Sequence, residues 1–256
     1  MPTPQQIIQN ELTRLAAERD FTILLAVESG SRMWGFPSPD SDYDVRFVYV
    51  QPREKYLSVF DHKDTITAFT HDGLYDYAGW DLRKFLRLAS SSNATPFVWT
   101  RSSIVYREQL DFRARFGEVL TDFFQPGKVL NHYRGMTRGT YAKLDPTAGV
   151  SVKKLLYVWY HWLCARWTVE HRSPPPTTIQ ELLPMVEQDF VRNHIEQLIE
   201  RKRTLLESEV VALDAPIQQF LAEEMERMEA WSTPKVALPE RERVDALFRE
   251  FVDVRS

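Results

Sequence analysis

Hydrophobic positions along the first fifty residues change their spacing from one segment to the next. Isoleucine and leucine recur at helical spacing in residues 3–19, where Thr3 stands at the position of a helix cap. Residues 21–28 (FTILLAVE) are a continuous apolar run of strand length, which predicts a buried strand. Residues 43–50 (YDVRFVYV) are rich in β-branched and aromatic side chains, which also favours a strand. The pattern predicts a helix followed by two strands.

The next segments predict a hairpin and then a helix. Residues 64–70 and 73–80 alternate well enough to pair as two strands across a turn at His71-Asp72-Gly73. After Asp81 the apolar spacing becomes helical, and Asp81 itself stands where an N-cap belongs.

From about residue 108 onward the sequence shows helical patterns and no convincing strand. The predicted helices cover residues 108–123, 127–143, 150–171, 187–210, 214–231 and 239–252. We therefore expect an α+β protein. Its N-terminal domain, residues 1–124, has a mixed sheet with flanking helices, and residues 125–256 form an all-helical domain that completes a cleft for the nucleotide and its acceptor.

Composition narrows the class of protein. The chain has 256 residues, of which 43% are hydrophobic and 27% charged, as in an ordinary globular protein. One cysteine excludes a disulfide framework and a cysteine-built metal site, so a metal would bind oxygen or nitrogen ligands. The sequence shows no signal peptide and no stretch of membrane-spanning length. We expect a cytoplasmic protein without a membrane partner.

Charge is unevenly distributed along the chain. The formal net charge is −4, which does not favour general binding to nucleic acid. Residues 127–172, however, carry eight basic and two acidic side chains. Such a local excess of positive charge can bind a polyphosphate.

Two short motifs predict a site for phosphate and metal. Gly30-Ser31 follows the strand of residues 21–28, where a glycine allows a ligand close to the backbone and the serine hydroxyl can donate a hydrogen bond. Asp42 and Asp44 stand two residues apart at the start of the next strand, so their carboxylates point to the same face. Paired carboxylate oxygens suit Mg²⁺, which takes its other ligands from water and from substrate phosphates.

A phosphoryl transfer with two metal ions usually requires a third carboxylate, which also orients or deprotonates the attacking hydroxyl. Asp76, inside the predicted strand of residues 73–80, fits this role best. Asp81 is the second candidate, although its position favours a helix cap.

These motifs resemble the signature of the DNA polymerase β-like nucleotidyltransferases, a Gly-Ser pair followed by an Asp-x-Asp on the next strand. The chain is most similar to the branch of predicted bacterial and phage nucleotidyltransferases that includes polymerase-β-like proteins of RNA-repair operons. The similarity covers residues 25 to about 170 and rests on GSRMWG, SDYDVRFVYV, DYAGWDLRKFLRL, SIVYRE and KKLLYVWYHWLCARW. The chain departs from the family pattern at Tyr160, where the family has an arginine, and at Asn93-Ala94-Thr95-Pro96, where it has Asn-Pro.

The resemblance implies a Mg²⁺-dependent transfer, with Mn²⁺ as an alternative ion. A nucleoside triphosphate (NTP) would lie against Gly30 and Ser31, and Asp42, Asp44 and Asp76 would serve as metal ligands and catalytic residues. The nucleoside monophosphate (NMP) would pass to an acceptor hydroxyl, and pyrophosphate would leave. Further phosphate contacts are expected from Arg138, Lys153, Lys154 and Tyr157.

The acceptor is left open by the sequence. The family label and the basic segment favour the 3′ end of an RNA such as tRNA, but a protein or a small-molecule hydroxyl also fits, including AMP transfer of the kind found in antitoxins. Two other classes remain: a sugar transferase, which would need a longer nucleotide-binding region before Asp42, and a family member that binds nucleotide or RNA without turnover.

Overall fold

The computed structural model describes residues 2–70, 73–145, 149–204 and 210–253. Its first helix, α1 (Pro4–Arg19), begins where the sequence predicts. Thr3 Oγ1 accepts a hydrogen bond from Gln6 N, and Gln6 Oε1 accepts one from Thr3 N, so the two residues form a capping box. The apolar stripe of this helix, which includes Ile8 and Leu12, is fully buried.

In the described part of the chain the main sheet has five strands. They are β1 (Thr22–Glu28), β2 (Tyr43–Val50), β3 (Thr65–Phe69), β4 (Tyr75–Asp81) and β5 (Val105–Glu108). Their order across the sheet is β3-β4-β2-β1-β5, with β2 and β4 parallel and every other neighbouring pair antiparallel. The predicted strands and the predicted hairpin are therefore confirmed, although its turn residues His71 and Asp72 lie outside the described residues.

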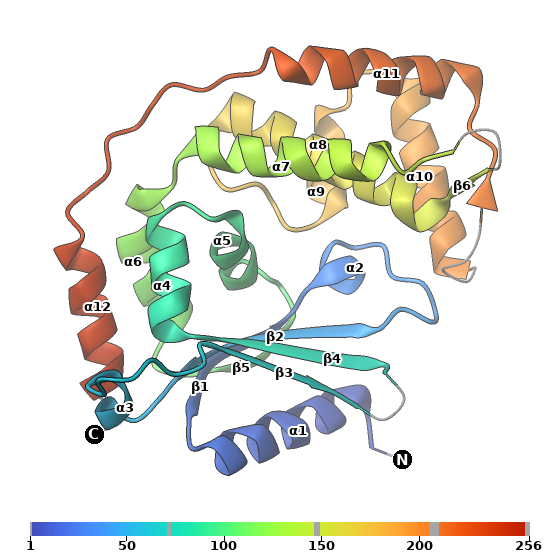
Figure 1. Ribbon diagram of the computed structural model, residues 1–256. Helices are drawn as coiled ribbons and strands as arrows, with labels where there is room; N and C mark the ends of the chain where they lie inside the picture. The colour runs from blue at the N-terminus through green and yellow to red at the C-terminus, as the bar shows by residue number, and fades with distance from the viewer. Residues whose placement is uncertain (1, 71–72, 146–148, 205–209, 254–256) are drawn as a thin grey trace. The chain divides into compact units, whose positions relative to one another are not determined.

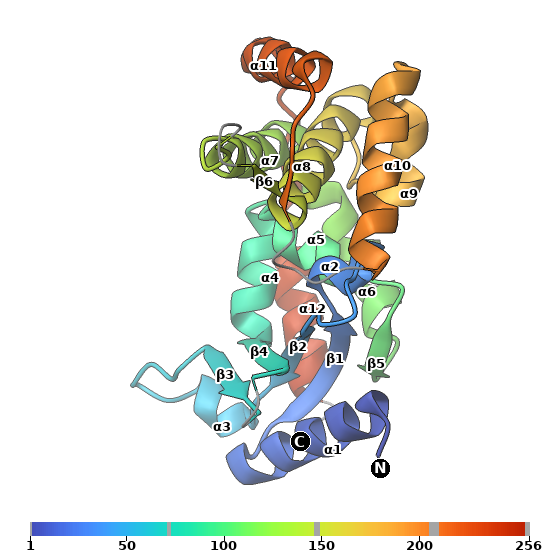
Figure 2. The same cartoon turned by 90° about the vertical axis from the view of Figure 1, so that its right-hand side faces the viewer.

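Helices cover both faces of this sheet. Figures 1 and 2 show α1 on one face, and α4 (Leu82–Ser90), α5 (Ala94–Thr100) and α6 (Phe112–Leu120) on the other. On the second face, Phe85 packs its ring against Trp99 and Phe116 at centroid distances of 5.9 and 5.5 Å. Aromatic pairs at such distances stabilise a core beyond the area they bury.

The C-terminal part is mostly helical. Its elements are α7 (Pro126–Tyr141), β6 (Val150–Ser151), α8 (Val152–His171), α9 (Ile179–Leu182), η2 (Leu183–Met185), α10 (Asp189–Thr204), β7 (Val210–Val211) and α11 (Ala215–Glu229). Helices α7 and α8 pack side by side (Figure 2). Trp159 and Trp162 of α8 are fully buried, and both rings contact Phe220 of α11.

The prediction of no strand after about residue 108 is wrong, because β6 and β7 pair antiparallel as a second, small sheet. Each of these strands has two residues, which is too short for a period to show in the sequence. β5 also lies immediately before the expected helix, which starts at Phe112 and not at residue 108.

The chain divides into two compact units. The first contains the residues up to Met33, Asp42–Phe124 and those from Ala237 on, and therefore includes α2 (Gly30–Met33), α3 (Arg53–Tyr56), η1 (Thr121–Phe123) and α12 (Glu242–Asp253). The second contains Trp34–Ser41 and Gln125–Val236. Within the first unit α12 packs against α4 and α6. The functional domains expected at residues 1–124 and 125–256 stay a proposal.

The two departures from the family pattern have local structural roles. Asn93 caps α5, since its Oδ1 accepts a hydrogen bond from Thr95 N at 2.9 Å. Tyr160 is buried in the second unit, where its hydroxyl donates to Thr177 O at 3.1 Å. None of the helices in the described residues combines the length and the apolar content that a membrane span requires.

Candidate active site

Asp44 and Asp76 lie side by side because their strands are parallel. The two residues are direct partners in the register of β2 and β4, one residue after the start of each strand. Arg46 follows Asp44 by two residues on β2, so its side chain emerges on the same face. Arg46 Nη2 contacts Asp44 Oδ1 at 2.5 Å and Asp76 Oδ2 at 2.8 Å. The structure thus directs two carboxylates, both largely shielded from solvent, toward one cationic group.

The Gly30-Ser31 turn packs directly against Asp44. Ser29 N donates to Asp44 O at 2.9 Å, which ties the turn to the start of β2. Gly30 has φ +61°, and a Cβ built on it would lie 2.0 Å from Asp44 Oδ2. Any side chain at residue 30 would therefore displace this carboxylate. Ser31 is 4% exposed and follows Gly30 in α2.

Asp42 stands immediately before β2 and its side chain is exposed. Arg32 Nε donates to its backbone oxygen at 3.0 Å, and the Arg32 guanidinium carbon lies 3.8 Å from the centre of the Tyr43 ring. Arg32 thereby fixes the segment that enters β2. In the part of the chain that the structure describes, no three His, Cys, Asp or Glu side chains are arranged to hold a metal ion. Two of the three expected carboxylates converge, and the catalytic roles of all three stay predictions.

Asp81 lies at the other end of β4, roughly 16 Å along the strand from Asp76 at about 3.3 Å per residue. Its buried carboxylate accepts hydrogen bonds from the side chains of Gln51 and Tyr56, each at 2.9 Å. It also accepts a bond from Arg83 N at 2.8 Å, which makes it the N-cap of α4. Of the two candidates for the third carboxylate, only Asp76 lies beside Asp44.

Glu28 is a site residue that the sequence analysis missed. It ends β1 and is fully buried, with Oε1 accepting from Asp44 N at 2.8 Å and Oε2 accepting from the Tyr106 hydroxyl. Burial raises the pKa of the Glu28 carboxyl to about 7, although the hydrogen bonds from Tyr106 and Asp44 N lower it. The sequence signal for Glu28 is a carboxylate at the end of an apolar strand. A charge buried there requires hydrogen-bond or ion-pair partners.

The candidate phosphate-binding residues of the second unit lie on two packed helices. Lys153, Lys154 and Tyr157 occupy the first turns of α8, with Lys153 Nζ 5.9 Å from the centre of the Tyr157 ring. Lys154 is exposed. Arg138 on α7 pairs with Glu229 of α11 at 2.9 Å. Lys154 and Arg138 are both exposed, and the charge of Arg138 already has a carboxylate partner.

Comparisons with known proteins extend over nearly the whole chain. A family model described as "RlaP: RNA repair pathway DNA polymerase beta family" matches residues 5–250. The uncharacterized protein YcgL of Bacillus subtilis (strain 168) is 39% identical over 225 residues, which cover 88% of this chain and 86% of that protein. The crystal structure of a nucleotidyltransferase-like protein from Exiguobacterium sibiricum 255-15 matches with a TM-score of 0.33 and 12% identity, covering 89% of this chain and 73% of that one.

Proposed function

The chain belongs to the RNA repair pathway DNA polymerase beta family, and on this premise we propose that it transfers NMP from an NTP to an acceptor hydroxyl and releases pyrophosphate. We propose the 3′ end of an RNA, such as a damaged tRNA, as the acceptor. The observation that supports the reaction best is the pairing of Asp44 with Asp76 beside the Gly30-Ser31 turn. A phosphate held at that turn would lie next to both carboxylates.

The residues of this site fit a divalent cation. The Asp44 and Asp76 carboxylates converge on one point, where the Arg46 guanidinium balances their charge. Carboxylate oxygens are the ligands that Mg²⁺ prefers, and Mn²⁺ accepts the same donors. Asp44 and Asp76 would hold the ion, and Asp42, two residues before Asp44, would be the third ligand. When bound, the ion would neutralise charge on the phosphates and stabilise the entering and leaving oxygens.

Residues of the chain would bind the phosphates, position the carboxylates and accept the proton. Gly30 and Ser31 bind the β- and γ-phosphates of the NTP, and before the ion binds, Arg46 holds the two carboxylates together. The Asp76 carboxylate accepts the proton of the acceptor hydroxyl as the oxygen attacks the α-phosphorus. A new bond forms between that oxygen and the phosphorus, the bond to the β-phosphate oxygen breaks, and pyrophosphate carries away the electron pair.

We further propose that Lys153, Lys154, Tyr157 and Arg138 bind the phosphates of the NTP. Kinetics with alanine variants test this part separately from the chemistry. Lys154→Ala should raise the KM for the NTP with a smaller effect on kcat, and Arg138→Ala should have less effect because Arg138 is paired with Glu229. An unchanged KM in all four variants would remove these residues from the proposal.

The decisive experiment follows the α-phosphate. Each of the four NTPs, labelled at the α-phosphate, is incubated with the protein, Mg²⁺ and mixed tRNA, in parallel with the Asp42→Ala/Asp44→Ala variant. Asp122→Asn serves as the matched control, because Asp122 is an exposed carboxylate paired with Arg243 in the same unit. We expect label on RNA with wild type and with the control, and none with the double variant.

The other outcomes separate the alternatives. RNA whose 3′ hydroxyl has been oxidised should accept no label. Label on protein or on a small molecule would overturn the RNA acceptor but keep the reaction. Equal labelling by wild type and the Asp42→Ala/Asp44→Ala variant, or no labelling by either, would contradict the proposed catalytic activity and favour a protein that binds without turnover.

A further inference from the structure

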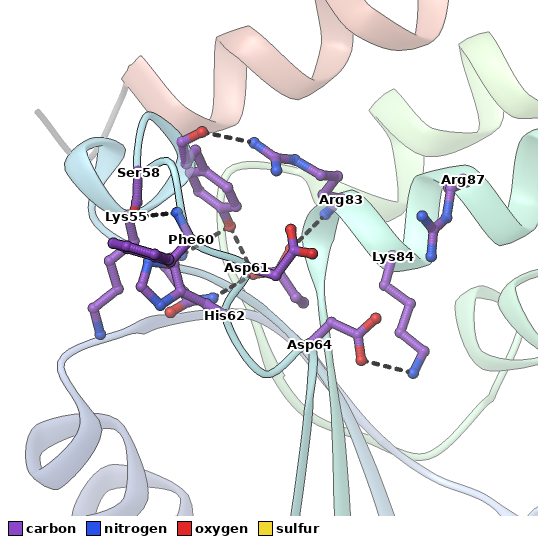
Figure 3. Close-up of a pocket in the computed structure, with 12 residues that line it drawn as sticks. Lys55, Ser58, Phe60, Asp61, His62, Asp64, Arg83, Lys84 and Arg87 are labelled. Carbon is purple, nitrogen blue, oxygen red and sulfur yellow. Dashed lines mark hydrogen bonds and ion pairs between the residues drawn. The ribbon is translucent and has the colours of Figure 1, made fainter.

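A pocket lies at the end of the sheet opposite the candidate active site. It has a volume of about 310 Å³ and opens where β2 and β4 end, beside Gln51 and Asp81. Figure 3 shows side chains from α3 and the following loop on one side of the pocket, and side chains from α4 on the other. Asp81 is roughly 16 Å along β4 from Asp76 at about 3.3 Å per residue, so the pocket is separate from the site of the proposed transfer.

The pocket has a small excess of positive charge. Lys55, Arg83 and Arg87 line it without forming an ion pair to a carboxylate among the described residues, as Figure 3 shows for Arg87. Two carboxylates that line the pocket already have partners. Asp64 pairs with Lys84 at 3.0 Å, and Asp81 accepts three hydrogen bonds. Four basic side chains against three carboxylates leave a surplus of one positive charge among the lining Lys, Arg and Asp residues, which favours an anion.

Two arginines line the pocket from α4. Arg83 and Arg87 are one helical turn apart on the exposed face of α4. Arg83 Nη2 donates to Tyr56 O at 3.1 Å, and its guanidinium carbon lies 4.9 Å from the centre of the Tyr56 ring. Arg83 is therefore held in place before any ligand binds, which reduces the entropy lost on binding. Guanidinium groups match phosphate geometry through paired N–H donors.

An exposed aromatic side chain stands opposite these arginines. Phe60 belongs to the loop after α3, lines the pocket and is 79% exposed. Figure 3 shows it beside His62, on the side of the pocket facing Arg87. A ring this exposed is available for stacking, and a nucleobase is a flat partner that stacks on such a ring whichever base it is.

We propose that this pocket binds a nucleotide, with the phosphate on Arg83 and Arg87 and the base stacked on Phe60. Its volume is at the lower end of the range for small-molecule sites. The ligand is a ribonucleotide phosphate, supplied either as a free nucleotide or as one residue of a bound RNA strand. This second site is distinct from the NTP site of the proposed transfer.

Binding assays in EDTA test the proposal without turnover. The probes are fluorescently labelled AMP and a labelled single-stranded oligoribonucleotide, with inorganic phosphate as competitor. The test variants are Phe60→Ala and Arg87→Ala, because neither side chain packs in the core. The matched controls are Phe69→Ala, on β3 and 69% exposed, and Arg107→Ala, on β5 at the other edge of the sheet.

We expect each test variant to weaken binding of at least one probe by about tenfold, and the controls to leave it unchanged. Weakening for both probes assigns the pocket to a free nucleotide, and weakening for the oligoribonucleotide alone assigns it to a residue of RNA. Equal binding by wild type and both test variants would overturn the proposal. So would displacement of the probe by inorganic phosphate with no effect of Phe60→Ala, since the pocket would then bind an anion only.

The Asp42→Ala/Asp44→Ala variant separates this result from the proposed function. It should bind both probes as wild type does, because its substitutions lie at the other end of β2. Loss of pocket binding in that variant would contradict two separate sites, whereas loss of transfer with intact pocket binding concerns the proposed function alone.

Discussion

The carboxylate of Asp44 occupies the place where a side chain at Gly30 would begin. A Cβ on Gly30 would lie 2.0 Å from Asp44 Oδ2, and the backbone there has φ +61°. Two independent constraints therefore require glycine at residue 30: a left-handed backbone and contact with a carboxylate. Gly30 therefore allows the turn at residues 29–31 to lie directly against Asp44.

Gly30→Ala should damage both stability and transfer. We expect a loss of about 1–3 kcal/mol in the free energy of unfolding, from backbone strain and from the displaced carboxylate. NMP transfer should fall by about a hundredfold, because a shift of about 1 Å in a catalytic group is enough for that loss. Urea unfolding and labelling at a temperature where the variant is folded measure the two effects.

Gly117→Ala is the matched control for this substitution. Gly117 lies within α6, and a Cβ there meets nothing within 4 Å. Alanine should therefore raise stability by about 0.5–1 kcal/mol and leave transfer unchanged. If the two variants behaved alike, the contact between residue 30 and Asp44 would have no special importance.

Substitutions at Asp76 and Asp81 should have different effects, the first on transfer and the second on stability. Asp76→Asn removes the proposed base, so transfer should fall by about 10²–10⁴-fold while stability changes little. Asp81→Ala removes the cap of α4 and the acceptor for Gln51 and Tyr56, so it should lower stability by about 2–4 kcal/mol. The Asp81→Ala protein that remains folded should still transfer NMP. Full activity in Asp76→Asn would remove Asp76 from the reaction.

The sequence predicts elements whose signal is local. Thr3 predicts the start of α1, and the apolar run before Glu28 predicts β1. The second contact of Arg46, to Asp76, required the parallel pairing of β2 with β4, and no local pattern specifies which strands become neighbours. The local sequence predicts that β3 and β4 pair as a hairpin. It does not predict that β4 lies beside β2, because that pairing depends on how the whole core packs.

Glu28 shows the same limit within the site. In the sequence it is one charged residue that ends an apolar run, as would be expected where a strand meets water. In the structure it is buried and accepts a hydrogen bond from Asp44 N, and β5 supplies Tyr106 to bind its second oxygen. Since β5 was not predicted as a strand, its contribution could not be foreseen.

Arg46 should compete with a divalent cation for the acidic pair. Arg46→Gln removes the positive charge that Arg46 places between Asp44 and Asp76, which should cost about 1–3 kcal/mol in metal-free buffer. Mg²⁺ should then raise the Tm of the variant more than that of wild type, because the ion binds the folded state only. Arg46→Lys keeps a positive charge and should behave more like wild type. An equal effect of Mg²⁺ on the Tm of wild type and Arg46→Gln would place the ion elsewhere.

His161 should make the protein less stable in acid. It is 2% exposed in α8, and burial lowers the pKa of its imidazole from 6.5 to about 3. Between pH 6.5 and 3 the unfolded chain binds a proton that the folded chain does not. This residue therefore contributes stability above pH 6.5 that is lost at up to about 1.4 kcal/mol per pH unit on acidification.

His161→Phe isolates this contribution, since phenylalanine has a similar shape and no proton to bind. Its ring can occupy the same place between Trp34 and Tyr133. Urea unfolding at pH 7.5 and at pH 5 should show a smaller loss of stability for His161→Phe than for wild type, by about 2 kcal/mol at most. Because the two proteins differ at one buried group, parallel loss of stability on acidification would mean that His161 becomes protonated in the folded protein.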